Sequence, residues 1–121
     1  MKIIVIDDDQ EILEVLESFF NSLGHSVIGV LNSAEGLKKV ASEIFDLVMV
    51  DINLPDKDGI TLLREIKHLD PKLPVVMITG YREADKVIEA FRNGAMDCLL
   101  KPFNFDYIKT TVLPQVVERK K

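Results

Sequence analysis

Short apolar runs alternate along the chain with longer stretches in which apolar residues recur every three or four positions. The short runs are nearly continuous, which is typical of strands that are buried on both faces. They cover residues 3–6, 27–31, 47–50, 75–78 and 96–100. The longer stretches predict helices, because their apolar positions fall on one side of a 3.6-residue turn. The pattern therefore predicts five units, each a strand followed by a helix.

Capping residues indicate where several of these helices begin and end. The first predicted helix follows an Asp cap and ends at Gly24, and the second begins at a Ser33 cap. The third ends at Asp70, and the fourth ends at Gly94. Asp and Ser side chains accept hydrogen bonds from free N–H groups at helix starts, and glycine adopts the left-handed conformation that ends a helix.

Five such units predict the α/β fold class, with a doubly wound parallel sheet covered by helices on both faces. Right-handed crossovers return the chain to neighbouring strands, which places helices on the two sides of the sheet. No repeat, low-complexity tract or linker divides the 121 residues, so we expect a single domain over residues 1–121. In open sheets of this kind, ligands bind beyond the carboxyl ends of the strands.

The charge balance is acidic, with 20 Asp and Glu against 15 Lys and Arg and a net charge of −5. This disfavours nonspecific attraction to nucleic acids or to anionic membranes. The apolar runs are far shorter than the roughly 20 residues of a membrane-spanning helix. Because there is no signal peptide and a single cysteine cannot form an internal disulfide, we expect a cytoplasmic protein without membrane association or direct nucleic acid binding.

Polar side chains follow four of the five predicted strands. Three consecutive Asp residues, 7–9, follow the first strand, Asp51 follows the third, Thr79 the fourth and Lys101 the fifth. Carboxylates that approach within a few ångströms repel one another by several kcal/mol, so a compensating cation is expected. Oxygen ligands suit Mg²⁺ better than zinc, and the two histidines lie far from these loops in the sequence.

These residue types suit the transfer of a phosphoryl group to a carboxylate. Asp51 stands alone at a strand end and is the candidate nucleophile, whereas the paired Asp7 and Asp8 are better suited to holding metal. Thr79 can donate a hydrogen bond to a phosphoryl oxygen, and Lys101 can neutralise phosphoryl charge. The sequence therefore predicts a site that accepts phosphate.

With these motifs in place, the whole chain resembles the receiver domain of two-component response regulators. The motifs that carry the resemblance are IDDD at residues 6–9, DLVMVD at 46–51, NLP at 53–55, DG at 58–59, PVVMITG at 74–80 and KPF at 101–103. The resemblance implies a flavodoxin-like fold with strand order 2-1-3-4-5 and a cis peptide bond before Pro102.

The resemblance also implies a function. Asp51 would accept a phosphoryl group from the histidine of a sensor histidine kinase or a phosphotransfer protein. Mg²⁺ would be bound by Asp8, by Asp51 and by the main-chain carbonyl of Asn53, and Asp7 would reach it through water.

Lys101 would pair with the acyl phosphate, and Thr79 would move toward it as the switch hydroxyl. The domain would be a switch rather than an enzyme, because it catalyses only its own phosphorylation and dephosphorylation. Its altered surface would control an output domain or partner that the sequence does not identify, and a phosphorylation-dependent homodimer remains open.

Three positions set this chain apart or add to the pattern. Cys98 stands where family members usually carry an aromatic residue, so we expect switching without an aromatic rotamer change and a structural rather than redox thiol. Pro114 falls about ten residues into the last predicted helix, which begins near Phe105, and predicts a kink or an early end there. Tyr81 is placed to cover the phosphoryl group, so Tyr81→Ala is expected to shorten its lifetime.

Three alternative functions fit the sequence less well. An aspartyl phosphatase of the haloacid dehalogenase type needs a second Asp two residues after its nucleophile, and Asn53 stands there. A flavodoxin needs a Ser- and Thr-rich phosphate loop after the first strand, where residues 7–9 would repel phosphate. A receiver-like module that never takes phosphate is disfavoured, because the site residues are all intact: Asp8, Asp51, Thr79 and Lys101.

Overall fold

Five parallel strands form one sheet in the order β2-β1-β3-β4-β5 in a computed structural model of the chain. The structure describes residues 1–120, with the main chain alone at Tyr81. The strands are β1 (Lys2–Ile6), β2 (Ser26–Val30), β3 (Leu47–Asp51), β4 (Val75–Thr79) and β5 (Asp97–Leu100). The predicted α/β class and strand order are confirmed, and each strand lies within one residue of its predicted bounds.

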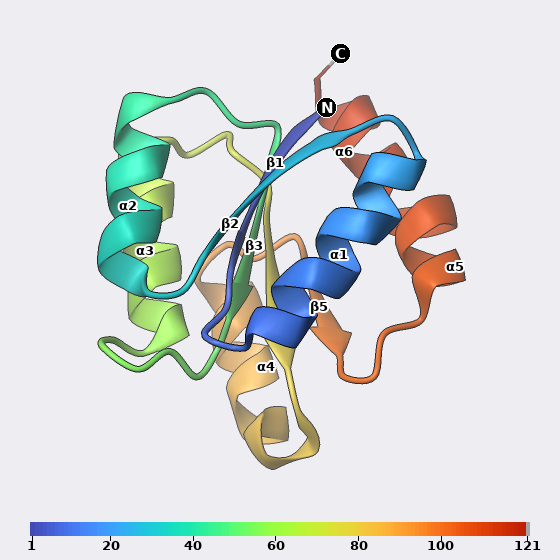
Figure 1. The fold of residues 1–121 in the computed structure, drawn as a ribbon. Helices are drawn as coiled ribbons and strands as arrows, with labels where there is room; N and C mark the ends of the chain where they lie inside the picture. Colours follow the sequence, from blue (N-terminus) through green and yellow to red (C-terminus); the bar gives the residue numbers. More distant parts are fainter. Residues whose placement is uncertain (121) are drawn as a thin grey trace.

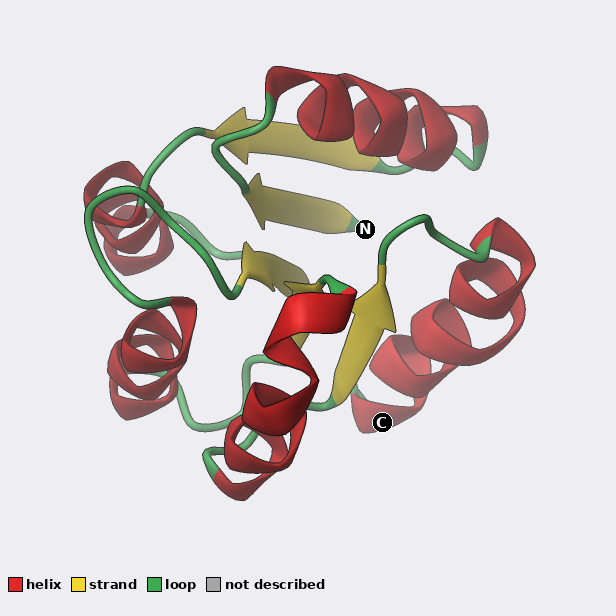
Figure 2. Cartoon of the chain, turned by 90° about the horizontal axis from the view of Figure 1, so that it is seen from below, coloured by secondary structure: helices red, strands yellow, loops and turns green. Residues whose placement is uncertain are grey.

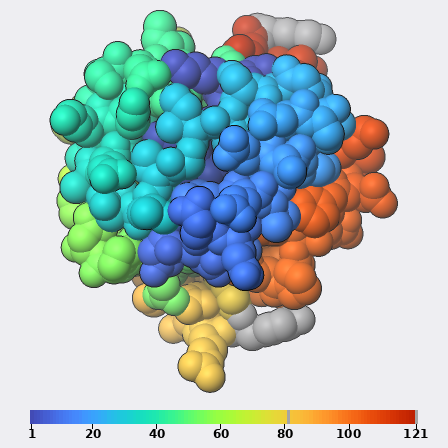
Figure 3. Space-filling view, viewed as in Figure 1, coloured from blue at the N-terminus to red at the C-terminus, as the bar shows by residue number. Residues whose placement is uncertain are grey.

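The helices cover both faces of this sheet (Figures 1 and 2). They are α1 (Gln10–Ser22), α2 (Ser33–Ser42), α3 (Gly59–Leu69), a short 3₁₀ turn η1 (Tyr81–Glu83), α4 (Ala84–Arg92), α5 (Phe105–Tyr107), a π-helical segment η2 (Ile108–Val112) and α6 (Leu113–Arg119). Helices α2, α3 and α4 lie on one face, and α1 and the α5–η2–α6 helix lie on the other. Figure 3 shows the side chains of α1 and α2 covering the near side of the molecule.

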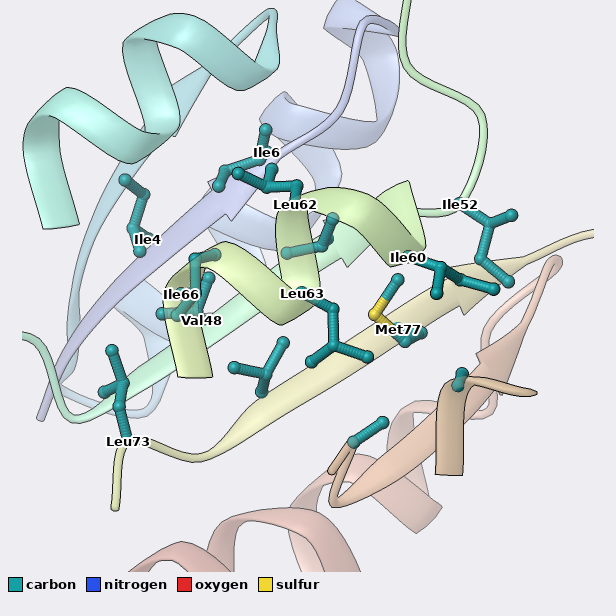
Figure 4. Close-up of a cluster of buried hydrophobic side chains, with 14 of the residues drawn as sticks. Ile4, Ile6, Val48, Ile52, Ile60, Leu62, Leu63, Ile66, Leu73 and Met77 are labelled. Atoms are coloured by element: carbon teal, nitrogen blue, oxygen red, sulfur yellow. The ribbon is translucent and has the colours of Figure 1, made fainter. Parts of the chain in front are cut away.

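The strands divide the apolar interior into two clusters, because successive side chains point to opposite faces of a sheet. In β1, Ile4 and Ile6 pack with α3 on one face, while Ile3 and Val5 pack with α1 on the other. Figure 4 shows the first cluster, in which the α3 side chains lie over β1, β3 and β4. Burying an aliphatic side chain of this size contributes roughly 1.5–3 kcal/mol, which explains why the continuous apolar runs form the central strands.

The loops after β1, β3, β4 and β5 all lie at one edge of the sheet, which is the lower end in Figure 1. This edge holds the carboxyl ends of the parallel strands, where the sequence places its polar residues. Among the described residues, no helix is long and apolar enough to cross a bilayer.

The start of α2 differs from the prediction. Its capping residue is Asn32, whose side chain accepts a hydrogen bond from the Glu35 N–H at 2.9 Å, and Ser33 is the first helical residue. The prediction that Ser33 caps this helix is therefore wrong. The Ser33 hydroxyl instead donates to Asp56, in the loop after β3, at 2.7 Å. The side chains of Asn32 and Ser33, at the start of α2, therefore each have a hydrogen-bond partner.

The last helix continues past Pro114 to Arg119, so it does not end early. The chain widens into the π-helical segment η2 just before the proline, and the Leu113 N–H donates to the Ile108 carbonyl five residues back. Thr110 also donates its hydroxyl to the Asp106 carbonyl at 2.6 Å. A wide turn of this kind removes the regular hydrogen bond that the proline cannot make and explains how the helix accepts it.

Candidate functional site

The strand register brings the predicted site residues to one level of the sheet. Ile6 pairs with Val50, so Asp7, which follows β1, and Asp51, the last residue of β3, come together at the edge. Thr79, the last residue of β4, pairs with Leu100, so Lys101 follows directly beyond it. Residues far apart in the sequence thus meet because four parallel strands end together.

Asp51 is the central carboxylate of this edge. Its side chain is 10% exposed, and Oδ2 lies 3.2 Å from Nζ of Lys101. Its other oxygen, Oδ1, accepts a hydrogen bond from the Asn53 N–H at 2.9 Å. One oxygen therefore faces the lysine, and the other is fixed by the main chain of the loop after β3.

Asp7 is completely buried. Its Oδ1 accepts a hydrogen bond from the Asp9 N–H at 2.9 Å, and Oδ2 lies 3.2 Å from Nζ of Lys101 but makes no hydrogen bond to any described residue. Burial raises the pKa of Asp7 to about 6; the Asp51 carboxylate raises it too, while the Asp9 N–H and Lys101 oppose the rise. The buried Oδ2 of Asp7 therefore has the nearby Lys101 charge but accepts no hydrogen bond from the described residues.

Lys101 is the cation shared by these two acids. Burial by itself acts to lower the pKa of its ammonium group, but the nearby Asp51 and Asp7 carboxylates outweigh burial and raise that pKa above its ordinary value. The ammonium group therefore stays charged. Lys101 precedes Pro102, and the peptide bond between them is cis, as expected.

The acidic residues fit a divalent cation. Asp7, Asp8 and Asp51 each offer a carboxylate oxygen, and these oxygens lie within 4.8 Å of one another. Asp8 is exposed, which leaves a side open to water, while Asp7 and Asp51 are buried. All-oxygen ligands with room for water, together with an Asp7 Oδ2 that accepts no hydrogen bond from the described residues, suit Mg²⁺.

Thr79, the last residue of β4, is brought to the same edge. It is buried, and its hydroxyl donates to the carbonyl of Gly80, the next residue, at 3.1 Å. The hydroxyl thus points along its own loop.

Asn53 is exposed, and its side chain makes a contact that the sequence did not predict. Its Nδ2 donates to Oε1 of Glu83, whose Oε2 accepts the Gly80 N–H at 3.0 Å. No sequence signal distinguishes Glu83 from other acids near the start of a helix.

The loop after β3 is anchored at two points. Asp56 accepts hydrogen bonds from Ser33 and from the Ala34 N–H at the start of α2, and these bonds lower its pKa to about 2. The Gly59 N–H donates to the Ile52 carbonyl at 2.8 Å, which holds the start of α3 against the end of β3. These contacts fix the loop that carries Asn53.

Cys98 is partly buried against the cluster that includes α3 and α4. Burial, with a smaller contribution from the Asp97 carboxylate, raises the pKa of its thiol to about 11, which disfavours the thiolate and a redox role. The side chain of Tyr81 lies outside the described residues, so its covering role stays a prediction.

A doubly wound domain with three aspartates and one lysine at the carboxyl ends of its strands defines a class of phosphate-handling α/β domains. The chain matches the response regulator receiver domain family over residues 3–113 and belongs to that family. The resemblance seen in the sequence motifs is therefore confirmed. The chain is a receiver domain of two-component signal transduction.

Individual relatives agree with this assignment. The chain is 38% identical over 110 residues to the transcriptional regulatory protein ZraR of Klebsiella oxytoca, covering 91% of this chain and 25% of that protein. It is 39% identical over 102 residues to the DNA-binding transcriptional regulator NtrC of Escherichia coli K12, covering 84% of this chain and 22% of that protein. The chain thus spans about a quarter of the length of these curated relatives.

Solved structures show the same fold. A CheY-like receiver domain protein from Methanospirillum hungatei superposes with a TM-score of 0.92 at 29% identity, covering 98% of this chain and 95% of that one. The receiver domain of NtrX from Brucella abortus gives a TM-score of 0.89 at 33% identity, with 96% and 98% of the two chains covered.

Proposed function

We propose that this receiver domain, extending over residues 1–121, is switched by a phosphoryl group on Asp51. The observation that carries the proposal is the setting of the Asp51 carboxylate. It is nearly buried at the end of β3, 3.2 Å from the Lys101 ammonium and within 4.8 Å of oxygens from Asp7 and Asp8. Such a carboxylate has a cation beside it and acidic neighbours that can hold another.

The chemistry is a transfer between two carriers. A carboxylate oxygen of Asp51 attacks the phosphorus of a phosphohistidine, the new O–P bond forms, and the N–P bond breaks. The imidazole nitrogen keeps the electron pair and takes up a proton from water. Lys101 neutralises phosphoryl charge during the transfer, and the Asn53 N–H, which already contacts Asp51, orients the carboxylate. Attack by water later returns the free carboxylate and inorganic phosphate.

The metal would be held by Asp8, by Asp51 and by the main-chain carbonyl of Asn53, with Asp7 acting through water. When bound, Mg²⁺ would supply positive charge to the phosphoryl oxygens. Thr79 would turn its hydroxyl from the Gly80 carbonyl toward the phosphoryl group and so move the loop after β4. Cys98 fills the position of the usual aromatic residue, so this movement would reach the surface of α4, β5 and the α5–η2–α6 helix without an aromatic rotamer change.

The proposed partners follow from this role. A sensor histidine kinase or a phosphotransfer protein in the cytoplasm would supply the phosphoryl group. The output would be a change of binding surface, read by an output domain or a partner protein, with a phosphorylation-dependent homodimer as one form of it. The names of the curated relatives favour control of transcription as the eventual effect.

Intact mass measured after incubation with acetyl phosphate and Mg²⁺ tests the proposal. The wild-type chain is expected to gain one phosphoryl group, and Asp51→Asn to gain none, because the amide is a poor nucleophile. An equal gain in the variant, or no gain in the wild type, would contradict the proposal. Steady turnover of small phosphate esters would indicate a phosphatase instead.

A further inference from the structure

Glu83 joins the two loops that flank Asp51. Its Oε2 accepts the main-chain N–H of Gly80 at 3.0 Å, and its Oε1 accepts Nδ2 of Asn53. Asp51 pairs with Ile78 across the sheet, so Asn53 and Gly80 each lie two residues beyond this pair. One carboxylate therefore takes a donor from each of the two loops at equivalent positions beside the phosphorylation site.

The Thr79 hydroxyl bonds to the same residue, Gly80. The Gly80 carbonyl accepts both the Thr79 hydroxyl, at 3.1 Å, and the Glu83 N–H, at 3.2 Å. Glu83 thus contacts both polar main-chain groups of Gly80: its side chain accepts the N–H, and its main-chain N–H donates to the carbonyl. While it does so, the Thr79 hydroxyl has a partner other than a phosphoryl oxygen.

A phosphoryl group on Asp51 would compete for these donors. It carries nearly two negative charges and three acceptor oxygens, and an ionised carboxylate is likewise an acceptor only. Donors beside the acceptor aspartate stabilise such an anion only if they are free to face it. A second anion close by also opposes the new charge.

From these contacts, and on the basis of the function proposed above, we propose that Glu83 is an internal latch. In the unphosphorylated domain, its carboxylate accepts hydrogen bonds from the Gly80 N–H and from the side-chain amide of Asn53, and so holds both loops in the resting arrangement. Phosphorylation displaces it and frees the Thr79 hydroxyl. Because the latch stabilises the resting state alone, it weakens the binding of any phosphoryl group or analogue to Asp51.

The test measures the affinity of the intact chain for beryllium fluoride, a phosphoryl analogue that binds carboxylates, by calorimetry in excess Mg²⁺. Glu83→Gln keeps the size of the side chain, but it removes the charge and replaces one acceptor oxygen with a donor. We expect affinity to rise by about threefold to tenfold, as for loss of a partly exposed charged hydrogen bond.

Asp85→Asn is the matched control. Asp85 is an exposed acid in the first turn of α4, and within the described part of the chain it forms no hydrogen bond or ion pair. It carries the same charge two residues further on, so its affinity is expected to equal that of the wild type. Thermal unfolding of each variant checks that the fold is kept.

The outcomes separate the latch from the function on which it rests. Binding to the wild type with no gain in Glu83→Gln, or with an equal gain in Asp85→Asn, would overturn the latch and leave the phosphoryl site intact. If Glu83 merely stabilises the turn, Glu83→Gln will lower the melting temperature without raising the affinity for the analogue. That result also overturns the latch. Failure of the wild type to bind the analogue would overturn both proposals.

Asn53→Ala provides an independent check, because it removes the partner amide and leaves the main chain in place. If the latch acts through this contact, Asn53→Ala and Glu83→Gln are non-additive, and the double variant gains less than the product of the two single gains. Fully multiplicative effects would show that Glu83 does not act through Asn53 and would overturn the two-loop latch.

Discussion

The two ends of the sheet carry similar numbers of charged side chains but pair them differently. At the amino end, Glu43 lies 2.7 Å from Lys2 and 3.2 Å from Lys39. Asp46 pairs with Lys120 and also accepts the Lys2 N–H at 2.7 Å. Hydrogen bonds from lysines lower the pKa of Glu43, and the contacts with Lys120 and Lys2 outweigh burial and lower that of Asp46.

At the carboxyl end, three aspartates lie close together, two of them share Lys101, and the pKa of the buried Asp7 is raised rather than lowered. The difference teaches how to distinguish structural acids from functional ones. An acid with a lowered pKa already has the partner it needs, and it stabilises the fold. A buried acid with a raised pKa has partners that do not offset its burial, and it costs stability until a ligand adds positive charge.

The largest expected difference between the two ends is in the loss of stability when a glycine is replaced by alanine. A Cβ at Gly59 would overlap the Asp51 carbonyl oxygen and lie 2.7 Å from Cα of Ile52, both of which are main-chain atoms that cannot move aside. Gly59→Ala should therefore lower the free energy of unfolding by about 3 kcal/mol. Urea denaturation measures this loss.

Gly24, in the turn before β2, is the control at the other end. Its φ is +86°, but among the described residues no atom outside the adjoining residues lies within 4 Å of its added Cβ, so Gly24→Ala should cost only about 1 kcal/mol. Equal losses in the two variants would show that close packing at the proposed phosphorylation site is not what requires Gly59.

The next largest expected effect is a gain of stability rather than a loss. Asp7→Asn removes a carboxylate whose pKa is about 6 in the folded state and near 4 when unfolded. A raised folded pKa means that stability is present below pH 4 and is lost as pH rises to about 6. The variant should therefore be more stable than the wild type by about 2 kcal/mol at pH 8, and nearly equal to it at pH 4.

Urea denaturation in EDTA at the two pH values measures the Asp7 effect without a metal ion. Adding Mg²⁺ at pH 8 should narrow the gap, because a bound cation stabilises the wild type more than the variant. A variant less stable than the wild type at pH 8 would mean that Asp7 is already well paired, like the acids at the amino end.

The smallest effect tests the amino end. Asp46→Asn removes an acid whose folded pKa is lowered, and such a group contributes stability that is present above its unfolded pKa and lost as pH falls. The variant should lose about 1 kcal/mol at pH 7, a discounted value because Asp46 remains partly exposed, and lose less near pH 3. An unchanged or increased stability at pH 7 would remove the contrast with Asp7.

Much of this molecule could be predicted from its sequence. The continuous apolar runs predict buried parallel strands, and the parallel arrangement forces Asp7, Asp51 and Lys101 to one edge. These predictions succeed because periodicity and strand order are global properties that a few residues cannot change. The sequence therefore locates the candidate site, although it cannot show that Asp51 takes a phosphoryl group.

Local contacts were harder to predict. Asn32 rather than Ser33 caps α2, since both residues can cap and the choice depends on Asp56, which lies 23 positions away from Ser33. The link from Glu83 to Asn53 joins loops 30 residues apart and leaves no periodic signal. Pro114 predicted a disturbance of the last helix, but only the packing of that helix decides between an early end and a wide turn.

The position of β3 has a mechanical consequence. Its Val48 and Val50 belong to the cluster under α3, its Leu47 and Met49 belong to the cluster under α1, and the strand ends in Asp51. Protein interiors are close-packed and nearly incompressible, so side chains transmit a displacement rather than absorb it. A displacement of Asp51 would therefore be transmitted through β3 to the helices on both faces of the sheet. These include α1 and the α5–η2–α6 helix, on the face opposite α4.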